Sequence, residues 1–156
     1  MRRHEKEVTD SNALEYILKH AQICHLAIND EDIPYIVPVN FGYEDNALYI
    51  HSATEGKKID LLNANPHVSF CIVSQAEIQP APKACGYTTI FSSVTGQGKV
   101  TFLSSMDEKK YGLSVIMKHH NGPHDDFPDD VMQRTAVIRI SITSMIGKAS
   151  KEALPA

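Results

Sequence analysis

Residues 48–62, LYIHSATEGKKIDLL, hold the residue types that bind a phosphate or another anion. Ser52 and Thr54 carry hydroxyl groups, and Lys57 and Lys58 directly follow a glycine. An apolar strand end precedes this polar turn, and an amphipathic helix start follows it. Backbone N–H groups at a helix start, hydroxyl groups and an ammonium group can converge on one phosphate. The pattern therefore indicates an anion site, with a plain strand–helix connection and solvated lysines as the alternative.

A second group of chemically capable side chains lies in residues 117–126, MKHHNGPHDD. Histidine and aspartate are common metal ligands. His119 and His120 are adjacent, however, so they cannot share one helix face, and Gly122-Pro123 indicates a turn. Cationic side chains near a helix C-terminus, followed by a capping loop, explain the run. We therefore predict no metal site here.

The composition is typical of one soluble globular domain spanning residues 1–156. Of these residues 42% are hydrophobic and 22% are charged, which excludes a disordered chain. The net charge of −4 gives no field that favours nucleic acid. The sequence has no apolar run near the roughly 20 residues that cross a bilayer. The start, MRRHEKEV, lacks the apolar region of a secretory signal.

The three cysteines argue against a disulfide framework or a zinc knuckle. Cys24, Cys71 and Cys85 are odd in number and show no CxxC spacing. Cys24 and Cys71 lie inside apolar strand-like runs, so we expect buried thiols that behave as small hydrophobes. This usage predicts a reducing, cytoplasmic location.

Hydrophobic periodicity predicts a helix, a run of short strands with one inserted helix, and then further helices and a closing strand. Thr9 or Asp10 is expected to cap the first helix. The helix that starts at Gly56 should stop near Asn65-Pro66, because the residue before a proline disfavours helical geometry. The expected helices are residues 10–20, 56–65 and 107–119, with a loop and a short helix within 120–133. The expected strands are residues 23–29, 33–43, 47–51, 68–73, 87–103 and 135–145, with 75–86 as a loop or edge segment.

These elements favour a mainly β fold over a doubly wound parallel sheet. The connections are short, and the strands alternate with period 2, which is typical of a closed or nearly closed antiparallel barrel. The sequence also lacks the GxGxxG fingerprint of a dinucleotide-binding Rossmann fold.

Four segments, in order, resemble the FMN-binding split-barrel family. They are YIVPVNFGY, LYIHSATEGKKIDLL, VSFCIV and YTTIFSSVTGQGKVTFL. The resemblance is greatest to the branch related to pyridoxamine 5′-phosphate oxidase that contains the nitroimidazole-resistance (Nim-type) proteins. It implies a six-stranded antiparallel split β-barrel with flanking helices (α+β). It also implies a homodimer that binds two flavins in grooves between its subunits.

The resemblance also implies where the flavin would lie. The backbone of Val37, Pro38, Val39 and Asn40 would follow the edge of the flavin ring. Pro38 has no N–H group for a strand ladder, so it suits an exposed strand margin. The alternative is an edge-strand proline without a ligand.

The resemblance implies that the phosphate end of the flavin lies at residues 48–62. His51 and Ser52 lie where the strand meets the ribityl-phosphate chain, and Lys57 and Lys58 lie where relatives place a phosphate-binding cation. The two lysines cannot both point the same way on a helix, so we expect one to bind and the other to be solvated. The resemblance favours Lys58 as the binding residue, because relatives often carry another residue at the Lys57 position.

Three further features carry implied roles. His51 could donate to a flavin carbonyl or pass a proton during reduction, which makes it the candidate catalytic residue; a histidine packed at a strand end is the alternative. The resemblance implies that Ser92 and Ser93 contact the same groove, from their own or from the partner subunit, although many relatives carry a cation at position 92. Residues 119–126 often lie near the active-site entrance in this family.

Two functions are compatible with these residues. The first is an oxidoreductase that holds FMN or FAD, takes electrons from NADH or NADPH and reduces small electron-poor aromatics such as 5-nitroimidazoles. The second is a non-catalytic flavin-binding protein, or a relative that binds pyridoxamine phosphate, pyridoxal phosphate or haem on the same fold. Oxidase activity on pyridoxamine phosphate is the weaker enzyme reading, because the tail IGKASKEALPA lacks an evident Arg/His pair for a second phosphate.

Overall fold

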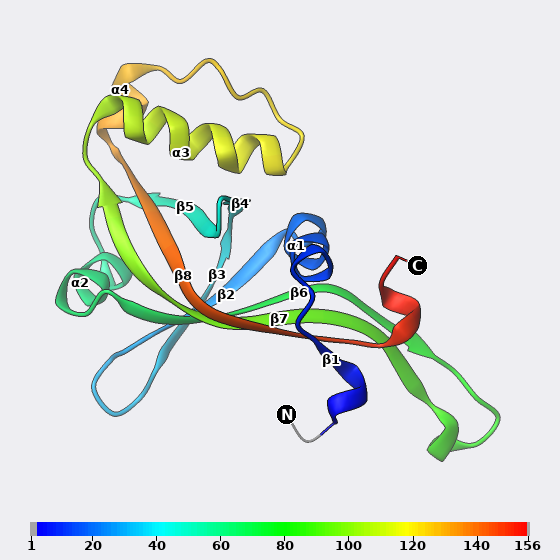
Figure 1. Cartoon of the computed structure of the whole chain (residues 1–156). Coiled ribbons are helices and arrows are strands. Elements are labelled where there is room, and N and C mark those ends of the chain that lie inside the picture. Colours follow the sequence, from blue (N-terminus) through cyan, green and yellow to red (C-terminus); the bar gives the residue numbers. More distant parts are fainter. Residues whose placement is uncertain (1–2, 156) are drawn as a thin grey trace.

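The computed structural model describes residues 3–155, which form one large antiparallel sheet with helices against it (Figure 1). These residues contain eight strands, in the hydrogen-bonded order β3-β2-β6-β7-β8-β5-β4, with β1 added to β8. The strands are β1 Glu7–Val8, β2 Ile23–Ile28, β3 Tyr35–Asn40, β4 Gly42–Glu44, β5 Ala47–Ala53, β6 His67–Gln79, β7 Thr88–Leu103 and β8 Thr135–Ala149. The α-helices are α1 Ser11–His20, α2 Lys57–Ala64, α3 Met106–His119 and α4 Asp129–Gln133.

The predicted antiparallel sheet with flanking helices is confirmed, but the predicted count of six strands is wrong. Within residues 3–155 the hydrogen-bonded path ends at β3 on one side and at β4 on the other, so the barrel stays split. The two additional strands are short. β1 has two residues on the edge of β8, and β4 is separated from β3 by Phe41.

Phe41 splits the strand that was predicted over residues 33–43. Its side chain is fully buried, and its ring lies 4.7 Å from the ring of His119 on α3. The next residue, Gly42, passes so close to α3 that an added Cβ would lie 2.6 Å from the carbonyl oxygen of Val115. The chain therefore leaves β3 here and docks against the helix, a contact between segments far apart in the sequence.

The long strands β6 and β8 extend further than predicted, whereas β7 matches its predicted bounds to within one residue. β6 continues to Gln79, so the first part of the segment 75–86, predicted as a loop or edge segment, is a strand that pairs with the start of β7. The two form an arm that projects from the body of the molecule in Figure 1. Register shifts at Val73/Gln75 and at Gln97/Gly98 mark irregularities in the long ladders. The second shift agrees with the expected bend near the glycines of β7.

Local start and stop signals were predicted well. The Asp10 side chain accepts a hydrogen bond from the N–H of Ala13 and so caps α1. The turn between β4 and β5 has Asp45 and Asn46 at φ 48° and 55°, as tight hairpin turns require. α2 ends at Ala64, just before Asn65-Pro66.

The core is divided into a main cluster and a small one. The main cluster lies between the inner face of the sheet and the apolar side of α1, including Leu14, Ile17 and Leu18. The small cluster lies under α3 and includes Tyr49 and Val115. Cys24 is buried as predicted, whereas Cys71 is only half-buried and Cys85 is exposed. No helix within residues 3–155 is long and apolar enough to cross a membrane.

Candidate functional site

The N-terminus of α2 is open, unlike those of the two longer helices. α1 is capped by the Asp10 side chain, and α3 by a capping box in which Ser105 and Glu108 bond each other's backbone. α2 begins after Gly56, which adopts φ 112° and provides no side-chain cap. The carbonyl of Gly56 accepts the N–H groups of Ile59 and Asp60, the third and fourth helical residues. No group in residues 3–155 accepts a hydrogen bond from the N–H groups of the first two helical residues, so these can bind an external acceptor.

The structure separates the two lysines that begin α2. Lys57 Nζ lies 2.7 Å from Asp30 Oδ2 and 5.3 Å from the centre of the Tyr35 ring. The hydrogen bond to Asp30 raises the pKa of Lys57. Lys58 is half-buried, burial lowers its pKa, and it forms no ion pair with any residue in 3–155. Lys58 is therefore the available cation at this helix end.

His51 and Ser52 lie at the end of β5 and face opposite sides of the sheet. Ser52 is half-buried on the face that carries the core residues Leu48 and Ile50, while His51 is on the face of Tyr49. Burial lowers the pKa of His51, and the positive charge of Lys58 lowers it further. Both effects favour the neutral imidazole, and the second shows that His51 lies close enough to Lys58 to sense its charge.

β3 provides a free strand edge beside this helix end. Within residues 3–155 it pairs with β2 alone, and it also approaches β5. Val37 and Val39 turn toward the core, and Pro38 and Asn40 are exposed on the other face. Lys57 contacts the ring of Tyr35, the first residue of β3, and so ties the start of α2 to the start of this edge.

The structure does not bring Ser92 and Ser93 to the same place within one chain. Ser92 is 1% exposed, and its Oγ lies 2.7 Å from Ser74 Oγ; Ser93 Oγ donates to the carbonyl of Lys148 at 3.3 Å. Ser92 pairs with Ala149 on β8, whereas His51 pairs with Val137. Those twelve positions correspond to about 40 Å along a straight strand. Even on a bent strand, the two serines lie far from α2.

Asp30 and Tyr35 are contacts of the site that the sequence analysis missed. The acidic turn at residues 30–32 was visible, but no local signal links it to a lysine 27 positions later. The ion pair of Lys57 with Asp30 and its contact with Tyr35 form because folding brings the β2–β3 hairpin next to the start of α2.

The histidine-rich segment has a structural role at its start. The ring of His119 hydrogen-bonds the carbonyl of Ala21 through Nε2 at 2.7 Å, so this nitrogen carries the proton. The contact fastens the end of α3 to the α1–β2 connection. Within residues 3–155, no group of three or more His, Cys, Asp or Glu side chains is arranged to hold a metal ion.

Acid is expected to weaken the fold through His119. Burial lowers the pKa of His119 below its ordinary value of 6.5, although the bond to Ala21 opposes this effect. The unfolded chain therefore binds a proton first, and the free energy of unfolding decreases as the pH falls through about 6.5. His119→Gln keeps an N–H donor but cannot titrate, so its unfolding free energy should change less between about pH 7.5 and pH 5.5. Urea unfolding at both pH values measures this, and identical pH dependence in the two proteins would contradict it.

The chain is similar to one known protein family in sequence and to several solved structures in fold. The sequence profile of the family described as Pyridoxamine 5′-phosphate oxidase matches residues 10–149. A crystal structure of a candidate 5-nitroimidazole antibiotic resistance protein from Bacteroides thetaiotaomicron is 32% identical, covers 91% of this chain and 85% of that one, and has a TM-score of 0.82.

More distant structures share the fold. The flavocytochrome from Azotobacter vinelandii is 18% identical over all of this chain and 74% of its own, with a TM-score of 0.81. A FAD-binding protein from Mesorhizobium loti is 23% identical over 94% and 98% of the two chains, with a TM-score of 0.68. In sequence, an uncharacterized protein of Rhizobium meliloti is 37% identical over 60 residues, which are 38% of this chain and 39% of that protein.

Proposed function

The chain belongs to the pyridoxamine 5′-phosphate oxidase family, and from that premise we propose that it is an FMN-binding oxidoreductase. The observation that supports flavin binding best is the open start of α2 beside Lys58. A phosphate there would accept hydrogen bonds from the first N–H groups of the helix and from the Lys58 ammonium group. Ser52 would add a hydroxyl donor. FAD would fit the same phosphate site if its adenylate extended into solvent.

The residues present suit such a cofactor. Gly56 provides no side-chain acceptor that would compete at the helix start, and the Asp30 carboxylate is already paired with Lys57. The edge of β3, from Val37 to Asn40, would run along the flavin ring. The contact of Lys57 with Tyr35 supports this placement, since it holds the start of that edge next to the start of α2. When bound, the flavin would supply the chemistry of hydride and electron transfer.

We propose that the reaction is reduction of a small electron-poor aromatic such as a 5-nitroimidazole, with NADH or NADPH as donor. The support is the 32% identity to the Bacteroides protein, which is described as a candidate 5-nitroimidazole resistance protein. Reduction of a nitro group consumes protons as well as electrons. His51, whose pKa is lowered by burial and by Lys58, would orient a flavin carbonyl or carry one of those protons.

The role of His51 is tested by replacing it with asparagine. We expect the FMN dissociation constant to change by less than about threefold, and the rate of NADH- or NADPH-driven nitroimidazole reduction to fall roughly tenfold to 100-fold. His67→Asn, at an exposed histidine of β6, is the control and should leave the rate unchanged.

Anaerobic bleaching of bound FMN by each donor is measured before these variants are compared. If neither donor bleaches the bound FMN, the protein binds flavin without catalysis. If the reduction rate of His51→Asn equals that of the unmodified protein, His51 does not carry a proton in the reaction.

We also propose a homodimer whose second subunit completes the groove. Ser93 and the buried Ser92 cannot reach the flavin of their own chain, so any contact from this part of β7 must come from another subunit. Sedimentation of the flavin-loaded protein tests this proposal. A holo-protein that remains monomeric would contradict it.

A further inference from the structure

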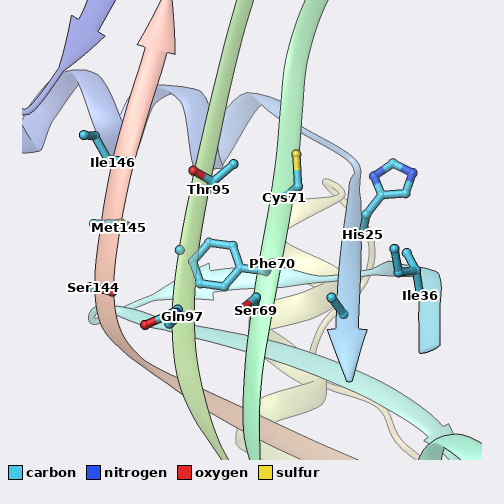
Figure 2. A pocket seen from close by; sticks show the side chains of 12 residues that line it. His25, Ile36, Ser69, Phe70, Cys71, Thr95, Gln97, Ser144, Met145 and Ile146 are labelled. Atoms are coloured by element: carbon cyan, nitrogen blue, oxygen red, sulfur yellow. The ribbon is translucent and has the colours of Figure 1, made fainter. Parts of the chain in front are cut away.

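Four of the eight large apolar side chains that are exposed within residues 3–155 lie on one face of the sheet. This is the outer face, which is turned away from the main core and contains a hollow of about 520 Å³ (Figure 2). The lining of the hollow comes from five neighbouring strands, β3, β2, β6, β7 and β8. Ile36 of β3 is part of this lining and is 63% exposed.

Alternation along the strands assigns Val73 and Ile23 to the same face. Val73 is two residues beyond Cys71, which lines the hollow from β6. Ile23 is two residues before His25, which lines the hollow from β2. The side chains of Val73 and Ile23 are 43% and 37% exposed. Apolar surface that gathers on one face in this way marks a contact with another molecule.

The apolar face continues onto the arm that the end of β6 and the start of β7 form (Figure 1). Ile78 of the arm is 62% exposed and pairs with Thr89. Thr89 is six residues before Thr95, which lines the hollow, so the two face the same way. Ser93, which we propose to reach the flavin of the other subunit, lies between them on this face. The apolar surface is therefore continuous with the proposed contact between subunits.

The position of α2 determines how the second subunit must be oriented. α2 precedes β6, which begins at His67, so α2 lies at the end of the long strands opposite to the arm. If the strands of both subunits ran the same way, Ser93 would lie level with its own pair Val73, six residues or about 20 Å from His67. A two-fold axis that crosses the strands at Cys71 instead places Ser93 level with Ser69, about 7 Å from His67. The reversed orientation is the one that brings Ser93 next to α2.

We propose that a second copy of the chain covers this face with its long strands antiparallel to those of the first, and that the arm of each subunit lies beside α2 of the other. Thr89 of the arm lies six residues from Thr95, which pairs with Cys71. An equal step from Cys71 in the other direction ends at Asn65, the residue that follows α2. The arm thereby closes the phosphate end of the flavin groove of the partner subunit. This arrangement rests on the proposed homodimer with a shared groove.

Val73→Asp tests the contact surface. A carboxylate without a partner in the apolar face should convert the dimer to a monomer in sedimentation and raise the Kd for FMN at least about tenfold. Val131→Asp is the matched control, because Val131 is 48% exposed but lies on α4, away from the hollow (Figure 1). It should leave both the dimer and the Kd for FMN unchanged. A Val73→Asp protein that is still a dimer would overturn the proposal.

The direction of the strands is tested with one nitroxide label per chain, on Cys85. Cys85 is exposed between the two strands of the arm, Cys24 is buried, and Cys71→Ser removes the remaining thiol. Pulsed electron paramagnetic resonance then measures the distance between the two labels of the dimer. We expect at least roughly 45 Å, because Thr95 and Thr88 are seven residues apart in each subunit, at about 3.3 Å per residue.

Two arms that lie side by side would instead place the labels roughly 10 Å apart, the spacing of sheets packed face to face, and would overturn the proposal. A monomer that binds FMN would also overturn it, while leaving the flavin site intact. A dimer that shows the long distance but binds no FMN would support the contact between subunits and contradict the flavin site.

Discussion

Replacing Lys58 by methionine is expected to raise the Kd for FMN roughly tenfold to 150-fold. A charge-assisted hydrogen bond to a phosphate contributes about 1.5–3 kcal/mol, and each 1.4 kcal/mol is a factor of about ten in Kd. Lys58 is half-buried and has no carboxylate partner among residues 3–155, so its charge is not already neutralised. Fluorescence quenching of FMN during titration with the purified apoprotein measures the effect.

Lys57→Met is the matched control for this substitution. Lys57 is the adjacent residue and carries the same charge, but its ammonium group is bound to Asp30. We expect its replacement to change the Kd for FMN by less than about threefold, in line with the small contribution of exposed ion pairs. A large loss with Lys57→Met and none with Lys58→Met would show that the assignment of the two lysines is reversed.

Gly42→Ala is expected to give the largest loss of stability. A Cβ at this position would lie 2.6 Å from the carbonyl oxygen of Val115 and 2.7 Å from the Cα of Ile116. Both atoms belong to the backbone of α3, so a side-chain rotation cannot relieve the overlap and the helix must move. Overpacking of this kind costs about 2–3 kcal/mol. The free energy of unfolding in urea, at constant m-value, measures it.

Gly122→Ala provides the comparison for Gly42→Ala. The nearest atom to a Cβ at Gly122 is the terminal methyl group of Met117, which can rotate away. We expect this variant to lose less than about 1 kcal/mol. If Gly42→Ala were as stable as Gly122→Ala, α3 would not pack on β4 as described, and the contact of Phe41 with His119 would lose its structural basis.

The sequence predicted best those features that depend on a few neighbouring residues. Asp10 caps α1, Asp45 and Asn46 form the hairpin turn, and α2 stops before Pro66, because capping, turn conformation and proline sterics act within four residues. The antiparallel class followed from alternation and short connections. The candidate anion-binding segment 48–62 could be selected because its glycine, hydroxyls and lysines are contiguous; that it binds a phosphate stays a prediction.

The features that sequence reasoning missed depend on contacts between distant segments. Phe41 breaks a strand because the C-terminal half of α3, at residues 115–119 and more than 70 positions later, packs against this part of the chain. β6 continues through a polar stretch because β7 pairs with it, although two prolines follow. Ser92 resembled a groove residue, yet its hydroxyl bonds Ser74 at the far end of the sheet from α2. Periodicity within one segment contains no information about such partners.

The central claim is that the open start of α2, with Lys58, holds the phosphate of a flavin. Calorimetric titration of the apoprotein with FMN and then with riboflavin, which lacks the phosphate, tests it most directly. We expect FMN to bind at least about tenfold more tightly than riboflavin, and the difference to shrink in Lys58→Met. Equal affinity for FMN and riboflavin, or no binding of FMN, would contradict the claim.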